Sequence, residues 1–134
     1  MILTRETDYA LRVLRCLRDC EKKTVGEIAA HSLVPQQFAY KIIKKLSRAG
    51  WVQISRGVDG GCLLSAELSS ISLYDLMAAM EDRCSVNACT QPDHECLWAQ
   101  QHGGCGMHRR FLVIQSRLDA ELRAHSLLSL LEDD

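Results

Sequence analysis

Residues 24–64 read TVGEIAAHSLVPQQFAYKIIKKLSRAGWVQISRGVDGGCLL, and this stretch decides the fold. Thr24 and Glu27 have the spacing of a capping box, in which the two side chains satisfy free backbone amides at a helix start. The pattern predicts a short helix over residues 25–31. Ser32, Leu33 and Val34 then form a tight connection.

A longer basic helix is expected over residues 35–49. Pro35 suits the first turn of a helix, and Gly50 suits the position just after its end. Residues 51–54 and 62–64 flank a glycine-rich turn, which predicts a β-hairpin. A short helix, a tight turn, a longer helix and a hairpin, in that order, are typical of a winged helix-turn-helix.

The polar face of the helix over residues 35–49 predicts contacts with DNA. Gln36 and Gln37 lie at its start, where an amide can bond adenine in the major groove. Lysines further along the helix can contact phosphates. The candidate DNA-binding residues are Gln36, Gln37, Tyr40, Lys41, Lys44, Lys45, Arg56 and Gly60. Two simpler interpretations stay open: the lysines form only a solvated helix face, and Tyr40 packs against the hairpin.

The net charge of −1 hides an asymmetry between the two halves of the chain. Residues 1–65 carry eleven Lys and Arg against six Asp and Glu, whereas residues 66–134 carry five against eleven. A basic first half favours a polyanionic partner such as double-stranded DNA.

The length of 134 residues predicts one domain, or a small domain plus an arm. No apolar run approaches the ~20 residues that span a bilayer, so no membrane association is expected. The first residues do not resemble a signal peptide, which predicts a cytoplasmic protein whose thiols stay reduced. No Cys-x-x-Cys redox pair and no Ser/His/Asp arrangement occurs, so an enzyme is not expected.

Helical periodicity predicts three further helices around the winged part. One runs from Thr4, as N-cap, to Cys20, and another from Ser72 to about Glu81. The last runs over about residues 108–131, with an apolar stripe along it. That stripe comprises Phe111, Ile114, Leu118, Leu122, His125 and Leu128. We therefore expect a DNA-binding domain over 1–65, and over 66–134 a linker helix, a loop and a long C-terminal helix.

The loop over about residues 82–107 concentrates thiols. Cys84, Cys89, Cys96 and Cys105 precede His108, with the spacing Cys-x4-Cys-x6-Cys-x8-Cys-x2-His. Thiolates favour iron–sulfur clusters, zinc and copper(I). Zinc sites usually show closely paired cysteines, whereas these wide spacings suit a larger group such as a cluster. Zinc, a thiol or disulfide switch, and no bound group remain alternatives.

Several motifs make the chain similar to the Rrf-type family of bacterial transcriptional regulators. This family includes the iron–sulfur biogenesis regulator, the nitric-oxide-sensing repressor and the cysteine-metabolism repressor. The motifs are TRETDYALR (4–12), IA (28–29), KKLSRAG (44–50), RGVDGGCLL (56–64) and ISLYDL (71–76).

This resemblance implies a homodimeric repressor of a palindromic operator, mainly α with a small β-hairpin wing and a long C-terminal dimerisation helix. It implies an iron–sulfur cluster, [2Fe–2S] ahead of [4Fe–4S], held by Cys89, Cys96 and Cys105. His108 is the expected fourth ligand, and Asp8 of the partner subunit is the alternative. The implied signal is redox state, nitric oxide or iron–sulfur status. A clusterless, zinc-bound or thiol-switch regulator of the same fold is the alternative.

The remaining cysteines lie outside the ligand set that the resemblance implies. Cys84 precedes the three expected ligands and is either a fourth thiol ligand or a bystander. Cys16, Cys20 and Cys62 are expected to be structural or incidental, since a buried free cysteine behaves as a small hydrophobe.

Overall fold

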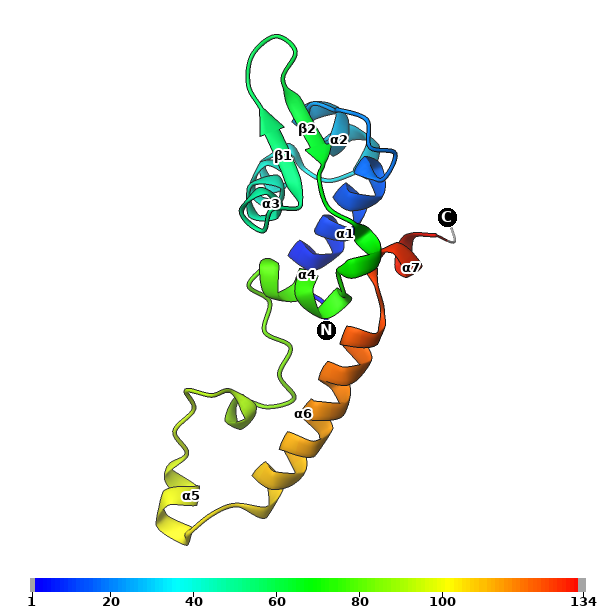
Figure 1. Ribbon diagram of the computed structural model, residues 1–134. Helices are drawn as coiled ribbons and strands as arrows, with labels where there is room; N and C mark the ends of the chain where they lie inside the picture. The colour runs from blue at the N-terminus through cyan, green and yellow to red at the C-terminus, as the bar shows by residue number, and fades with distance from the viewer. Residues whose placement is uncertain (1, 133–134) are drawn as a thin grey trace.

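The computed structural model describes residues 2–132, and its architecture confirms the predicted fold class: mainly α with a two-stranded antiparallel hairpin (Figure 1). The elements are α1 (Arg5–Leu17), α2 (Val25–Ser32), α3 (Gln36–Arg48), β1 (Val52–Ser55), β2 (Gly61–Leu64), η1 (Leu68–Ser70), α4 (Leu73–Ala79), η2 (Ala88–Thr90), α5 (Leu97–His102), α6 (Gly106–Ala124) and α7 (Leu127–Leu131).

Local capping sets the helix starts. The Thr24 hydroxyl accepts from the Glu27 amide at 3.2 Å, and the Glu27 carboxylate accepts from the Thr24 amide at 2.9 Å, which completes the expected capping box of α2. Ser72 and Asp75 form a second capping box at α4. Gly50 has a φ of +81° just after α3, a left-handed conformation that glycine adopts without steric cost.

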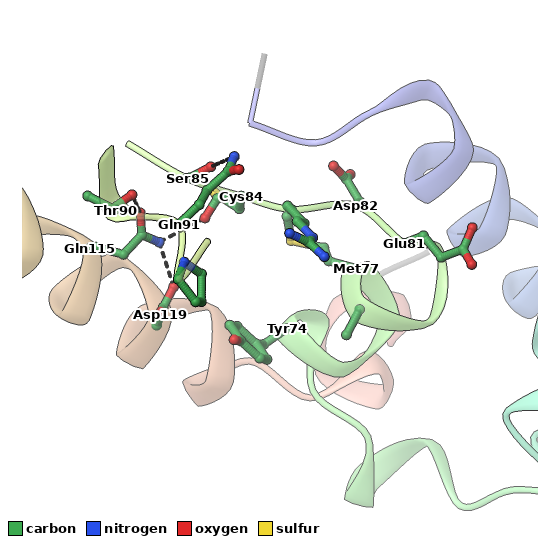
Figure 2. Close-up of a pocket in the computed structure, with 13 residues that line it drawn as sticks. Tyr74, Met77, Glu81, Asp82, Cys84, Ser85, Thr90, Gln91, Gln115 and Asp119 are labelled. Carbon is green, nitrogen blue, oxygen red and sulfur yellow. Dashed lines mark hydrogen bonds between the residues drawn. The ribbon is translucent and has the colours of Figure 1, made fainter. Parts of the chain in front are cut away.

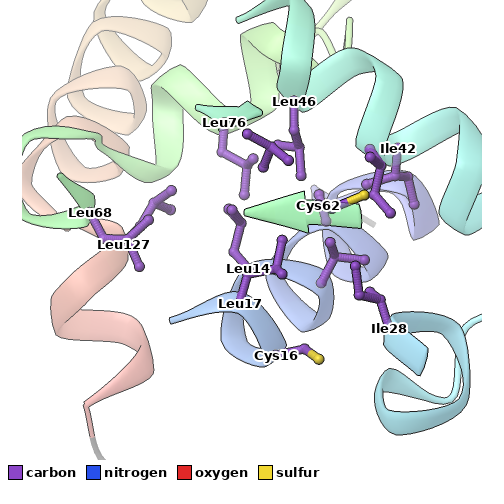
Figure 3. Close-up of a cluster of buried hydrophobic side chains, with 14 of the residues drawn as sticks. Leu14, Cys16, Leu17, Ile28, Ile42, Leu46, Cys62, Leu68, Leu76 and Leu127 are labelled. Atoms are coloured by element: carbon purple, nitrogen blue, oxygen red, sulfur yellow. The ribbon is translucent and has the colours of Figure 1, made fainter. Parts of the chain in front are cut away.

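The main core lies where α1, α2, α3 and the hairpin meet (Figure 3). Leu14, Ile28, Ile42 and Leu46 are fully buried there. Cys62 on β2 is also buried, and burial raises the pKa of its thiol, as it does for Cys16 on α1. These two cysteines therefore act as small apolar side chains, as expected. Cys20 is exposed.

The C-terminal helix differs from the prediction of one helix over residues 108–131. It begins at Gly106 and ends at Ala124, and His125 is extended with a φ of −103° and a ψ of 113°. Ser126 then caps the separate helix α7, its hydroxyl accepting from the Ser129 amide at 3.1 Å.

The break has a physical cause in the main core. Leu127 is 0% exposed and Leu131 is 2% exposed, so α7 returns to pack on the body of the protein. The Leu127 amide donates to the Ile71 carbonyl at 2.8 Å, and the Leu73 amide donates to the His125 carbonyl at 2.9 Å. A straight continuation of α6 would carry Leu127 and Leu131 out of the core and would break these two backbone hydrogen bonds.

The predicted stripe on the last helix is therefore divided. Leu122 is buried against α4, together with the half-buried Leu118, while His125 and Leu128 lie beyond the end of α6. Ile114 is 50% exposed and Val113 is 54% exposed. Helix α6 projects away from the winged part, with α5 beyond its start (Figure 1). The segment over 82–107 is not wholly irregular, because it contains η2 and α5.

Candidate nucleic-acid interface and candidate metal centre

Helix α3 presents a polar face to solvent, and the hairpin formed by β1 and β2, here called the wing, stands beside it (Figure 1). Gln36, Gln37 and Lys44 are exposed, and Tyr40 is 58% exposed rather than packed on the wing. Arg56 is exposed at the turn of the wing. These five side chains are placed where a double helix could reach them.

Two of the expected phosphate contacts are paired with an acid on α1. Glu6 binds Lys41 through one carboxylate oxygen and Lys45 through the other, the second at 2.7 Å. Hydrogen bonds from Lys41 and then Lys45 hold the pKa of Glu6 below its ordinary value. Lys41 remains 54% exposed, but the Lys45 side chain is only 12% exposed. No local pattern in the sequence indicates this pairing, since 39 positions separate Glu6 from Lys45.

Gly60 has a structural reason to be glycine. A Cβ at this position would lie 2.5 Å from the Ser55 carbonyl oxygen, and the Gly60 amide donates to the Gly57 carbonyl at 3.0 Å. Gly60 therefore closes the wing turn at a point where two stretches of backbone lie too close together for a side chain. Arg56 is the cationic side chain of this turn that can contact a nucleic acid.

The expected cluster ligands come from three separate segments. Cys89 lies in η2, Cys96 is the N-cap of α5, and Cys105 is the N-cap of α6 with His108 in the first turn that follows. All four side chains line one cavity of about 490 Å³, here called the cysteine cavity. The fold thus brings together residues that the sequence spreads over about twenty positions.

The donor set of the cysteine cavity fits an iron–sulfur cluster in its chemistry, since three thiols and one imidazole are ligands that such clusters accept. Within residues 2–132, no three His, Cys, Asp or Glu side chains lie close enough to hold a single metal ion as placed.

Other residues of the cysteine cavity were not anticipated. They are Asn87, His94, Glu95, Ala99, Gln100, Met107 and Phe111. These residues lie between or beside the expected ligands in the sequence, and that proximity could have indicated that they line the same cavity. Phe111, expected on the apolar stripe, instead forms part of the cavity wall.

Asp8, the alternative fourth ligand, does not line the cysteine cavity of its own chain. It lies on α1 in the winged part and pairs with Arg12 one turn on, at 3.0 Å. A role for Asp8 as a ligand therefore requires a second copy of the chain.

Cys84 lies in a different cavity, also of about 490 Å³, between α4, α6 and the start of the loop (Figure 2). Burial, followed by the nearby charges of Asp119 and Asp82, raises the pKa of its thiol. A raised pKa disfavours the thiolate that metals and oxidants require. Cys84 is therefore set apart from the other loop thiols in both place and chemistry.

Gln115 on α6 holds the loop in place (Figure 2). Its amide nitrogen donates to the Cys84 carbonyl and to Asp119, both at 2.8 Å. Its amide oxygen accepts from the Val86 backbone at 2.7 Å and from the Thr90 hydroxyl at 3.3 Å. Because Thr90 follows Cys89 directly, these bonds fix one expected ligand relative to α6.

Comparison with known proteins identifies relatives over nearly the whole chain. The model of the Rrf2 family, described as an iron-dependent transcriptional regulator, matches residues 3–133. The chain is 30% identical to the HTH-type transcriptional regulator NsrR of Geobacillus kaustophilus over 99% of this chain and 91% of that protein. It is 38% identical to protein aau3 of Rhizobium meliloti, over 66% of this chain but 59% of that relative's length.

Solved structures share the fold. IscR of T. potens aligns with a TM-score of 0.64 at 16% identity, covering 98% of this chain and 86% of that one. CymR, the global cysteine regulator of B. subtilis, aligns with a TM-score of 0.67 at 19% identity, covering 98% and 97%. No helix within residues 2–132 is both long and apolar enough to cross a membrane.

Proposed function

Because the chain belongs to the Rrf2 family of transcriptional regulators, we propose that it is a sensor whose DNA affinity responds to an iron–sulfur cluster held in the cysteine cavity. The observation that carries this proposal is the convergence of Cys89, Cys96, Cys105 and His108 on one cavity. Relatives that regulate transcription support the DNA-binding half of the proposal, and the cavity supports the sensing half.

Each residue has a defined part in the proposed site. Cys89, Cys96 and Cys105 would supply thiolates, and His108 would supply an imidazole nitrogen. A bound cluster would supply redox and ligand-exchange chemistry. The protein positions the thiolates through η2 and the starts of α5 and α6. Phe111 and Met107 line the cavity on the side of α6.

The proposed DNA contacts divide by role. Gln36 and Gln37 read base edges in the major groove, while Lys44 and the exposed part of Lys41 contact phosphates. Arg56 contacts the minor groove or the backbone beside it. The protein is proposed to act in the cytoplasm on a palindromic operator, as a repressor.

A second copy of the chain completes the proposed regulator. Two recognition helices read half-sites about one helical turn apart. The exposed Val113 and Ile114 on α6, with Leu112 at 43%, give an apolar surface that a second α6 could cover. Replacement of Ile114 by glutamate should convert a dimer to a monomer in sedimentation, whereas the same change at the exposed Ser116 should not.

Purification without oxygen tests the cluster. We expect visible absorbance together with bound iron and acid-labile sulfide in stoichiometric amounts. Cys105→Ala should remove the colour, the iron and the cluster-dependent change in DNA affinity. Cys20→Ala is the matched control, because that thiol is exposed and lies outside the cavity. A Cys105→Ala protein with unchanged iron and sulfide contents would exclude the proposed ligand set.

A clusterless thiol switch is the second candidate, favoured by the likeness in fold to CymR and by seven free cysteines. It predicts a colourless protein whose DNA affinity changes on treatment with peroxide and recovers with a thiol reductant. Iron and sulfide contents separate it from the cluster sensor before any DNA is added.

A further inference from the structure

Lys45 has a different task from the other lysines of α3. We propose that Lys45 is a positioning residue that ties the recognition helix to the start of the cysteine loop, so that the occupancy of the cysteine cavity sets the position of α3 on DNA. This inference rests on the proposed function and assigns the route by which its two halves communicate.

The contacts of Lys45 join three elements. Its ammonium donates to Glu6 on α1 at 2.7 Å and to the Met80 carbonyl at the end of α4 at 3.1 Å. Glu81, the next residue, lies 3.4 Å from the same nitrogen. An ammonium has three donors, and three acceptors surround this one. At 12% side-chain exposure, Lys45 has little capacity left for a DNA phosphate.

The favourable charges outweigh the cost of burying the ammonium. Burial acts to lower the pKa of Lys45, but the hydrogen bonds and charges of Glu6 and Glu81 together exceed that effect and raise it. Lys45 therefore stays charged and paired across the ordinary pH range, as a persistent tie between α3 and the end of α4.

Asp82 ties the next part of the same segment to α1. One oxygen of its carboxylate accepts from the Thr4 amide at 3.0 Å and from the Thr7 hydroxyl at 2.9 Å. Thr7 is 0% exposed, so the donor end of this bond is buried. Figure 2 shows Glu81 and Asp82 where the chain leaves α4 for the loop. Residues 80–82 are thus bonded to both α1 and α3.

The loop beyond this segment is also held, which leaves little slack. Gln115 on α6 bonds Cys84, Val86 and Thr90, and Cys89 lies between the last two. In this proposal, filling or emptying the cavity moves Cys89 together with the segment that Gln115 holds, and that movement reaches residues 80–82. Lys45 passes that shift to α3, where a small displacement changes the fit of two half-sites.

Two matched variants test the tie: Lys45→Met, and the control Lys44→Met on the exposed face of the same helix. The probe is a duplex enriched from a random library by the wild-type, cluster-loaded protein. Binding is measured with cluster-loaded and stripped protein over a range of salt. We expect a wild-type ratio of the two affinities of about 5- to 150-fold.

The two variants should fail in different ways. Lys45→Met should lower that ratio to below about twofold, with iron content and salt dependence unchanged. Lys44→Met should keep the ratio but reduce the slope of log affinity against log salt by about 0.9 for each phosphate that is no longer neutralised. A Lys45→Met protein that keeps the wild-type ratio, or whose salt dependence falls as that of Lys44→Met does, would overturn the inference.

A second variant covers the case in which Lys45→Met does not fold. Thr7→Val removes the hydroxyl donor to Asp82 without changing the side-chain shape, and should lower the ratio several-fold at unchanged iron content. An unchanged ratio in Thr7→Val would also overturn the inference. Failure of the proposed function is separately visible: the wild-type protein would then bind no cluster, or would bind DNA equally well in both states.

Discussion

Replacing Gln115 by leucine tests whether α6 holds the cysteine loop in place. The change keeps the approximate volume of the side chain but removes its donors and its acceptor. Three hydrogen bonds to the loop disappear, those with Cys84, Val86 and Thr90. The bond to Asp119 disappears as well, but it joins residues of the same helix.

The expected magnitude follows from these bonds. Each contributes about 0.5–1.5 kcal/mol net, and neighbouring bonds to one side chain are not additive. Their joint removal should favour local opening of the loop by about 2 kcal/mol, or roughly 30-fold in the opening equilibrium. Global unfolding should change little, because the main core lies in the winged part of the chain.

Amide hydrogen exchange measures this opening directly. The Val86 amide, which donates to Gln115 at 2.7 Å, should exchange roughly 30-fold faster in Gln115→Leu, while the amides of α1 should not change. Cleavage by trypsin after Arg83 should accelerate in parallel. Loss of iron to a chelator should also be faster, since Cys89 lies within the released segment.

Gln101→Leu provides the control, because Gln101 is an exposed glutamine on the neighbouring helix α5. It undergoes the same chemical change while the hydrogen bonds between Gln115 and the loop stay intact. If the Val86 amide hydrogen exchanged at the same rate in Gln115→Leu and in Gln101→Leu, the assignment of Gln115 as the residue that holds the loop would be refuted.

Three further predictions concern stability and thiol chemistry. Leu127→Ala should lower the free energy of unfolding in urea by about 2–5 kcal/mol, whereas Leu130→Ala, 38% exposed, should cost less than about 1 kcal/mol; equal costs would contradict the packing of α7 on the core. Lys41 and Lys45 hold the pKa of Glu6 in the folded protein below its ordinary value of 4.5. The stability that Glu6 contributes is therefore present above pH 4.5 and is lost as the pH falls through the lower pKa of the folded state. Glu6→Gln should weaken the fall of the urea midpoint of unfolding on the acid side, measured as a function of pH. Cys84→Ala should leave the iron content unchanged and should not alter the rate at which the other loop thiols react with iodoacetamide. The reason is that the raised pKa of Cys84 makes this thiol a poor nucleophile. A large fall in iron content would place Cys84 among the ligands.

The winged helix-turn-helix could be predicted closely because its signals are local. Thr24 and Glu27, three positions apart, set the start of α2, and Gly50 ends the region of α3. The same local logic failed at the C-terminus. Ser126 is a valid helix N-cap, but the apolar pattern runs through it, so only the burial of Leu127 and Leu131 separates α7 from α6.

The candidate site was predictable in its residue types but not in its geometry. Thiol spacing indicated a bound group in the cysteine loop, the family resemblance singled out Cys89, Cys96 and Cys105, and the fold places these three residues around one cavity. The spacing could not separate Cys84 from them, because its removal to the second cavity depends on α4 and α6 packing beside it. The roles of these three cysteines in binding a cluster remain predictions.

The sequence by itself determined the starts of α1 to α4, the wing turn, the family and the clustering of thiols, because each depends on residues close together in the chain or on residue type alone. Only the tertiary structure decided which charges meet. Lys41, Lys44 and Lys45 look equivalent on a helix, yet packing of α3 against α1 and α4 buries Lys45 among Glu6, Met80 and Glu81. Partners 35 to 39 positions away are brought within reach by helix packing, which no local pattern specifies.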